Sequence, residues 1–414
     1  MATETDSHTG YDGEGDGDPG HETFEDIDWS EDTGRAVLSR RDVGLLGVLA
    51  VLAVGFVYDY VAVPTDTATF EFDLPSGVPL FGDSFVWDVT QLDWLFLVTL
   101  VVMVFYVVLP LSDNRRLTAY YWRQFRKNRL AVVSLVYLVV VFLIGTMGPI
   151  FIPAPELALT QQYQPPVFTT VDTSVPIQCV GEVTGDACHG SLAHPLGTTG
   201  DGKDILVLVI YGMQVSMKLG LITTLLVISI GTAVGTVAAY SGGMVDETLM
   251  RYVDIQLTFP TFLLYLLLVF LFGGSLFMFI VLFGLTSWGG ISRLVRSEAL
   301  QLREEEYVMA ARSAGADAAY VIRRHLVPNV SSTVITAATL AIPGYILAEA
   351  ALSFLQLGDP TIPSWGQVIA AGRSDLDTAW WISTFPGFFL FFTILAFNFM
   401  GDALRDALDP RADK

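Results

Sequence analysis

The chain has 414 residues, of which 52% are hydrophobic and only 16% are charged, and its mean hydropathy is +0.53. Soluble domains carry about 25% charged residues, so this composition argues against a soluble enzyme, a disordered protein or a coiled coil, and favours a polytopic membrane protein. The formal net charge of −21 argues against a nucleic-acid partner, because phosphates require a basic face. Only four of the 22 basic residues are lysines, and an acid-rich, lysine-poor surface of this kind indicates a halophilic source.

The N-terminal 42 residues differ from the rest of the chain. Residues 1–34 contain 12 acids and no Lys or Arg, and their apolar content is too low to form a core. Segments of this composition stay disordered. We therefore predict a disordered acidic tail over residues 1–42.

From residue 43 onward, apolar runs of bilayer-crossing length alternate with short polar segments. The predicted fold is all-α, with about eight transmembrane helices. Asp59 interrupts the first run, and Gly273-Gly274 marks a hairpin within an uncharged stretch that is too long for one crossing. The expected spans are 43–63, 93–111, 130–152, 218–240, 255–272, 275–292, 330–348 and 382–401.

Basic residues mark the cytoplasmic side of a membrane protein. They precede span one, separate spans two and three, separate spans six and seven, and follow span eight, whereas 64–92 and 153–200 have none. We therefore expect a multi-pass protein of the cell membrane with both termini in the cytoplasm. Residues 115–129 mix Arg and Lys with aromatic rings, which predicts a helix in the membrane interface, with a positively charged linker as the alternative.

These features divide the chain into five parts. They are the tail (1–42), a two-span extension (43–114), the interfacial helix with the first core span (115–152), an external loop (153–204) and the remaining core (205–414).

No sequence pattern indicates a catalytic or metal site. The segment from Gly197 to Asp204 is close to the phosphate-binding P-loop pattern, but Asp204 replaces the hydroxyl residue that would hold magnesium. Cys179 and Cys188 are the two cysteines, and both fall in the external loop, where an oxidising environment permits a disulfide. We expect this pair to be bridged.

The segment 293–329, between spans six and seven, is the most informative part of the sequence. We expect two short helices in it. The first should end near Ala314, because Gly315 can take the left-handed conformation that ends helices. The second should begin after Asp317, a typical N-cap residue, and end at Pro328.

The first of these helices carries a face of small side chains. Tyr307, Ala310, Ala311 and Ala314 share that face by their spacing of three and four residues. Small residues permit close approach of another surface. Because the same segment contains six arginines and five acids, docking to a partner is favoured over packing on neighbouring helices.

This segment resembles the EAA loop of permease subunits in binding-protein-dependent ABC importers, whose pattern is EAA-x3-G-x9-I-x-LP. Here the pattern is represented by Met309-Ala310-Ala311, Gly315 and Leu326-Val-Pro328. Residues 115–414 are also similar to the C-type permease of dipeptide, oligopeptide and nickel importers. The most specific matching stretches are His194–Thr198, Leu249–Asp254, Leu352–Gly358, Pro363–Gly366 and Ala396–Asp402.

The resemblance implies a transport subunit, not an enzyme. It implies a six-helix core that forms half of the translocation pathway with a second permease in a hetero-dimer. It also implies two ABC ATPase subunits, which would hold ATP and magnesium, and an extracellular substrate-binding protein, with no cofactor on this chain. The residues that the resemblance implies for coupling to the ATPase are Tyr307, Met309, Ala310, Ala311, Arg312, Ala314, Gly315 and Pro328.

Two departures from the family pattern stand out. Met309 occupies the position of the glutamate that gives the EAA loop its name, and residues 1–112 add a tail and two spans to the six-span form. The substrate is left open between peptides, nickel chelates and glutathione. A stand-alone channel or secondary carrier, and a membrane-anchored signalling scaffold, are the alternatives from other functional classes.

Overall fold

The computed structural model describes residues 40–64, 69–73, 84–87 and 89–408. The chain divides into two compact units, Met1–Val43 and Gly44–Lys414, and the contacts reported below lie in the second. The predicted acidic tail lies outside the described residues up to residue 39.

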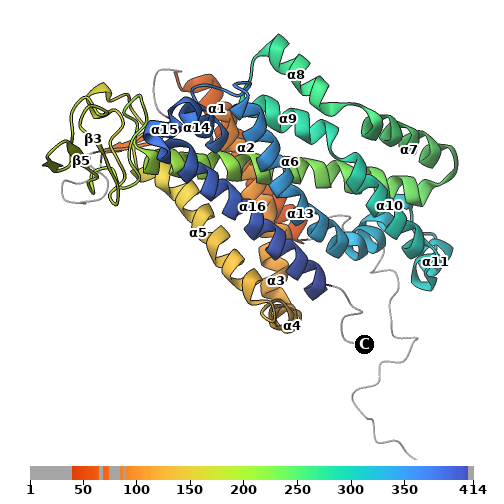
Figure 1. The fold of residues 1–414 in the computed structure, drawn as a ribbon. Helices are drawn as coiled ribbons and strands as arrows, with labels where there is room; N and C mark the ends of the chain where they lie inside the picture. Colours follow the sequence, from red (N-terminus) through yellow and green to blue (C-terminus); the bar gives the residue numbers. More distant parts are fainter. Residues whose placement is uncertain (1–39, 65–68, 74–83, 88, 409–414) are drawn as a thin grey trace, which may run out of the picture. The chain divides into compact units, whose positions relative to one another are not determined.

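The described part of the chain is mainly helical, as predicted (Figure 1). Among the described residues, seven helical segments are long and apolar enough to cross a membrane, and a bent helix pair makes up to eight. The α-helices are α1 Arg40–Ala62, α2 Gln91–Met103, α3 Leu109–Asp113, α4 Arg115–Phe125, α5 Arg129–Phe151, α6 Ile205–Ser241, α7 Gly243–Thr258, α8 Thr261–Phe272, α9 Leu276–Thr286, α10 Gly289–Arg303, α11 Glu306–Ser313, α12 Ala318–Val321, α13 Val327–Phe354, α14 Trp365–Ala371, α15 Leu376–Ala379 and α16 Trp381–Leu408. The π-helical turns are η2 Val104–Val108 and η4 Ile322–Leu326, and the 3-10 turns are η3 Leu159–Gln161 and η5 Gly372–Asp375.

Several expected spans have different limits in the structure. The fourth begins at Ile205 and not at 218, because Asp204 caps α6 by accepting hydrogen bonds from the N–H groups of Leu206 and Val207. The fifth, expected over 255–272, is broken. Pro260 separates α7 from α8, which meet at a bend of 75°, because proline has no N–H to continue the helix.

The sixth expected span, 275–292, also differs. It consists of α9 and the start of α10, and α10 continues to Arg303. The hairpin expected at Gly273-Gly274 is confirmed, since α8 ends at Phe272 and Gly273 has a φ of +82°.

α6 is the central helix of the described core and contacts α5, α9, α10 and α13 (Figure 1). Gly231 and Gly235 allow α10 to approach closely. A Cβ atom at Gly235 would lie 2.6 Å from the backbone oxygen of Ser292. Small residues four apart are a common device for close packing of membrane helices.

The largest cluster of buried side chains lies between α5, α6, α13, α14 and α16. Trp365 and Trp381 are each only 1% exposed within it. Both indole N–H groups are satisfied, because Trp365 donates to the backbone oxygen of Val209 at 3.1 Å and Trp381 to that of Thr198 at 3.0 Å. A second cluster joins α2, α6, α8, α9 and α13.

Short strands lie in two connections that the sequence analysis left without regular structure. β1 (Phe70–Asp73) pairs antiparallel with β2 (Ser84–Trp87). In the segment 153–204, β5 (Ala187–His189) pairs antiparallel with both β3 (Thr170–Asp172) and β4 (Val183–Thr184). The structure joins Cys179 to Cys188, a residue of β5, in a disulfide.

The P-loop-like segment has a structural role. Asp204 caps α6 and also lies 2.8 Å from Nδ1 of His194, and Thr198 accepts the hydrogen bond from Trp381. Gly197 contacts the indole ring of Trp381 so closely that a Cβ atom would lie 2.7 Å from its nitrogen. The glycines of this segment therefore serve packing at the start of α6.

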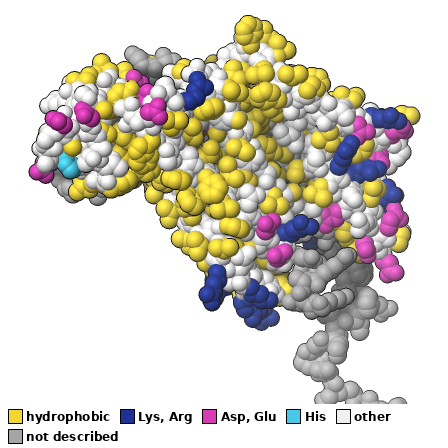
Figure 2. Space-filling view, in the orientation of Figure 1, with side chains coloured by type: hydrophobic (Ala, Val, Ile, Leu, Met, Phe, Trp, Pro, Cys, Tyr) yellow, Lys and Arg dark blue, Asp and Glu magenta, His cyan; other side chains and the backbone are white. Residues whose placement is uncertain are grey.

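The surface agrees with a membrane-spanning protein. Figure 2 shows hydrophobic side chains over most of the helical region on this face, and Lys and Arg gathered near α4 and near α7, α10 and α11. α4 matches the predicted interfacial helix, and Leu117 and Trp122 on it are 50% and 44% exposed.

Candidate functional site

The predicted docking helix is α11, and its end is set locally. Gly315 has a φ of +88°. The N–H of Ala314 donates to Ala310, and the N–H of Ala316 donates to Ala311. These bonds satisfy the last carbonyl groups of the helix in the manner of a glycine-terminated C-cap. The predicted stop at Gly315 is therefore confirmed.

The small-residue face of α11 is largely open. Val308 is fully buried and fixes α11 on the core, whereas Ala310 and Ala314 are exposed and Ala311 is half-buried. The larger residues of the predicted set are also accessible, with Tyr307 43% and Met309 46% exposed. The helix therefore presents a surface to solvent and does not bury its small residues among neighbouring helices.

The second predicted helix begins as expected but does not end at Pro328. Asp317 caps α12 by accepting from the N–H of Tyr320 at 2.6 Å. The chain then passes through the π-helical turn η4 into α13, and Pro328 lies in the first turn of α13. The wider turn before Pro328 accommodates the missing N–H, so the helix continues to Phe354 instead of stopping.

His325 connects the two short helices, and the sequence analysis assigned it no role. Its ring centroid lies 5.8 Å from that of Tyr307 on α11 and 5.8 Å from that of Tyr320 on α12. Partial burial, and secondarily the charge of Glu305, raises the pKa of Tyr307, so its hydroxyl stays neutral. The aromatic contact holds α11 against the start of α13.

Arginines on α10 attach the docking segment to the rest of the core. Arg296 forms two hydrogen bonds of 2.5 Å with the carboxylate of Asp246 on α7. Arg293 pairs with Asp254, also on α7. The first pair is bidentate, with side-chain exposures of 32% and 17%, whereas both partners of the second are about half exposed. The Arg296–Asp246 pair is therefore the stronger attachment.

Two further arginines reach the end of α6. Arg303 donates to the backbone oxygen of Ala239 at 2.8 Å, and the guanidinium of Arg312 lies 5.5 Å from the ring centroid of Tyr240. A cation at the C-terminal end of a helix is stabilised by the free carbonyl groups there. Four of the six arginines in this segment thus bind the chain's own α6 and α7, so their number is weaker support for a docking partner than the sequence analysis assumed.

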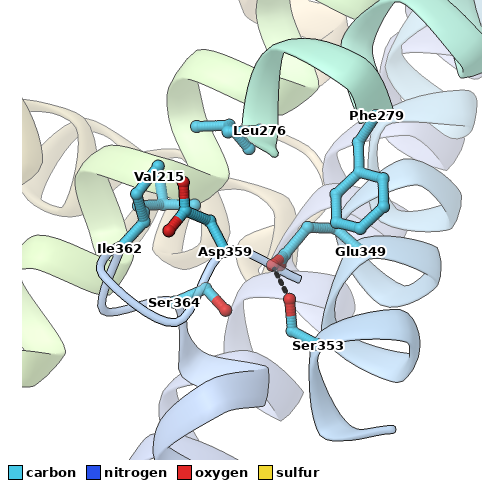
Figure 3. A pocket seen from close by; sticks show the side chains of 8 residues that line it. All are labelled: Val215, Leu276, Phe279, Glu349, Ser353, Asp359, Ile362 and Ser364. Carbon is cyan, nitrogen blue, oxygen red and sulfur yellow. Dashed lines mark hydrogen bonds between the residues drawn. The ribbon is translucent and has the colours of Figure 1, made fainter. Parts of the chain in front are cut away.

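A small cavity lies on the other side of the core, at the C-terminal end of α13. It is partly open to solvent and is lined by residues of α6, α9, α13 and the loop before α14 (Figure 3). Glu349, which is 3% exposed, accepts a hydrogen bond from Ser353 at 2.6 Å. Asp359 lies on the loop side of the cavity and accepts from Thr361. The hydrogen bond from Ser353 lies within α13 and gives Glu349 a structural role.

Comparison with known proteins adds the family. Residues 231–414 match the family described as "Binding-protein-dependent transport system inner membrane component", and residues 117–166 match "N-terminal TM domain of oligopeptide transport permease C". The chain is 35% identical over 290 residues to the oligopeptide transport system permease protein OppC of Haemophilus influenzae, which covers 70% of this chain and 87% of that protein. The chain belongs to the permease family of binding-protein-dependent transport systems. This permease is also 35% identical over 294 residues to the dipeptide transport system permease protein DppC of Bacillus subtilis, covering 70% and 84% of the two chains.

Family membership places the described elements in context. The permease is a multi-pass membrane protein and a transport subunit. The docking segment α10–α12 lies within the match to the inner membrane component. By contrast, α1 to α3 lie before residue 117, where the first of the two matches begins.

Proposed function

We propose that this permease is one of two membrane subunits of an ATP-driven importer of dipeptides and oligopeptides, and that α11 is the helix through which ATPase subunits drive it. The names of the relatives, oligopeptide and dipeptide transport permeases, support the substrate class. The exposed small-residue face of α11, on a segment fixed to α6 and α7, is the observation that supports the coupling role.

The proposed assembly contains four other proteins and is embedded in the lipid bilayer. A second permease completes the pathway, two ATPase subunits with ATP and magnesium lie on the cytoplasmic side, an extracellular protein delivers the peptide, and lipid surrounds the spans. Both termini of this chain are cytoplasmic in this arrangement, which follows from the distribution of Arg and Lys. We assign Met309, which stands in place of the family's glutamate, to the same coupling segment as Arg312, Gly315 and Pro328.

The contacts of α10 suggest how motion reaches the membrane. If an ATPase displaces α11, α10 moves with it, and the Arg296–Asp246 pair transmits the displacement to α7. α7 leads to the bend at Pro260. ATP can drive this change only by binding one arrangement of the complex more tightly than the other.

A bulky residue on the open face of α11 tests the coupling role. We expect Ala310→Trp to abolish ATP-dependent peptide uptake and co-purification of the ATPase, because the indole fills the space that the ATPase surface needs. Ala310 is the cleaner position, since Ala311 is half-buried and a large side chain there would also disturb packing. Ala371→Trp, at an exposed alanine of α14, is the matched control and should leave the ATPase bound. Normal uptake by Ala310→Trp would refute the docking assignment.

Substrate class needs a separate measurement. In membrane vesicles that contain the complete transporter, a labelled dipeptide should enter only with ATP, and unlabelled peptides should compete with it. Stronger competition by a nickel chelate or by glutathione would reassign the substrate within the family. Uptake that persists without ATPase subunits would instead indicate a secondary carrier.

A further inference from the structure

One buried charge in the described core has its partner in the N-terminal extension. Lys218 is the single charged residue of α6, and it is 8% exposed. α6 is a candidate membrane span. An ammonium group within such a helix is costly unless a counter-charge lies beside it.

The counter-charge is Asp93, in the first turn of α2. Its Oδ1 lies 2.7 Å from Nζ of Lys218, and the two side chains are 13% and 10% exposed. Its Oδ2 accepts hydrogen bonds from the N–H of Thr90 at 3.0 Å and from the hydroxyl of Thr90 at 2.6 Å. This capping box holds the carboxylate in place, so that one oxygen remains directed at the lysine.

Apolar contacts surround the ion pair. Phe96, one turn further along α2, is 6% exposed and belongs to the cluster that includes Val215 and Leu219 of α6. Its ring centroid lies 6.3 Å from that of Phe142 on α5. α2 is therefore packed against the same face of α6 that carries Lys218.

α1 is attached to this arrangement through Asp59, the residue that interrupts its apolar run. The indole N–H of Trp94 on α2 donates to Asp59 at 2.9 Å, and the hydroxyl of Thr69 donates to its other oxygen at 2.7 Å. Gly55 allows the contact, since a Cβ atom there would lie 2.8 Å from the Trp94 ring. The acid in the first span thus joins α1 to α2.

We propose that the extension α1–α3 is a fixed part of the permease core, docked on the Lys218 face of α6, and that Asp93 is the obligate counter-charge of that lysine. The matches to the transport families begin only at residue 117, so they assign no such role to α1–α3. The Lys218 face of α6 fits a helix that has an acidic residue in its first turn and an aromatic residue one turn later. In this chain that helix is α2, with Asp93 and Phe96.

A double-mutant cycle in the full-length chain tests this proposal without depending on transport. The variants are Asp93→Asn, Lys218→Met and the two combined, and the measurement is the midpoint of thermal unfolding in detergent-solubilised membranes. Each single change leaves one buried charge uncompensated, and we expect each to lower the midpoint by about 5 °C. The combined variant removes both charges, so its midpoint should be no lower than that of either single variant.

The exposed pair of Glu247 and Arg251 on α7 provides the matched control. Both side chains are at least 70% exposed, so Glu247→Gln, Arg251→Met and their combination should change the midpoint by about 1 °C or less and show no coupling. Additive losses for Asp93→Asn and Lys218→Met would overturn the proposal. If a single variant fails to accumulate in the membrane, accumulation becomes the measurement. The combined variant must then restore it, and failure to do so would equally overturn the proposal.

Discussion

The two long segments that connect membrane-spanning helices in this permease are stabilised in different ways. The segment α10–α12 is helical, and it is attached to α6 and α7 by arginine side chains. The segment 153–204, which we predict to be external and call the external segment, contains little helix and depends on short strands, a disulfide and hydrogen bonds between side chains and backbone. The first arrangement leaves one helix face exposed, whereas the second buries a few polar side chains such as Gln164 and Thr198.

Gln164 shows how the external segment is built. It is 2% exposed, and its side-chain amide donates to the backbone oxygen of Gln178 at 2.6 Å and accepts from the N–H of Val180 at 2.9 Å. Its own N–H donates to the hydroxyl of Thr198. One buried residue thus connects the stretch 178–180 to Thr198, and both polar atoms of its side chain have a partner, as buried polar groups require.

We expect the largest loss of peptide uptake from a change in α10–α12, which we call the open segment, at the turn that follows α11. Gly315→Pro should abolish uptake, because proline cannot adopt a φ of +88° and lacks the N–H that Gly315 donates to Arg312. The spans should remain folded, so the protein should still accumulate in the membrane and the external segment should keep its resistance to protease. Gly315→Asn is the control, since asparagine tolerates the left-handed conformation, and it should retain most of the uptake. Loss of accumulation in Gly315→Pro would contradict the view that this turn serves coupling and not folding.

A smaller loss of peptide uptake is expected from a change in the ion pair that attaches α10 to α7. Arg296→Met leaves the Asp246 carboxylate without its bidentate partner, which costs about 1–3 kcal/mol for a partly buried charge. We expect ATP hydrolysis to continue while peptide uptake falls by roughly tenfold, the equivalent of about 1.4 kcal/mol lost in coupling. Uptake and hydrolysis are measured together in vesicles.

Two variants make the Arg296 experiment specific. Arg251→Met removes an arginine that is 75% exposed on the same helix as Asp246, and it should leave uptake unchanged. Asp246→Asn combined with Arg296→Met removes both charges and should regain part of the uptake. An equal loss from Arg251→Met would show that net charge, and not this pair, controls coupling.

Sequence reasoning succeeds for the open segment because helix limits are set by nearby residues. The stop at Gly315 and the cap at Asp317 each depend on residues within five positions. The same local reasoning explains the hairpin at Gly273. Local reasoning fails at Pro328, because the π-helical turn η4 just before it allows the helix to continue through the proline.

Long-range contacts account for what the sequence did not reveal. Asp246 and Arg296 are separated by 50 positions, so neither carries a local sign of the other. The same holds for Asp59 and Trp94, so the sequence shows Asp59 only as an interruption of the first apolar run. The strands of the external segment are two to three residues long, and their pairing depends on contacts such as those of Gln164, which no periodicity reveals.

The smallest functional effect is expected from the disulfide of the external segment. The bridge closes a loop with a sequence separation of nine, for which chain entropy gives a stabilisation of about 2–3 kcal/mol. Cys179→Ser combined with Cys188→Ser should therefore speed proteolysis of residues 170–190 from the outside, while uptake stays within roughly twofold of the parent. The Gln164 hydrogen bonds and the contact between Thr198 and Trp381 remain in this variant, so the segment keeps its attachment to α16. Reduction of the parent protein should reproduce the faster proteolysis, and Gln164→Ala should exceed it, because it removes the hydrogen bonds to the backbone oxygen of Gln178 and the N–H of Val180. If the double serine variant lost uptake as completely as Gly315→Pro, the external segment would have to take part in coupling, and the contrast between the two segments would fail.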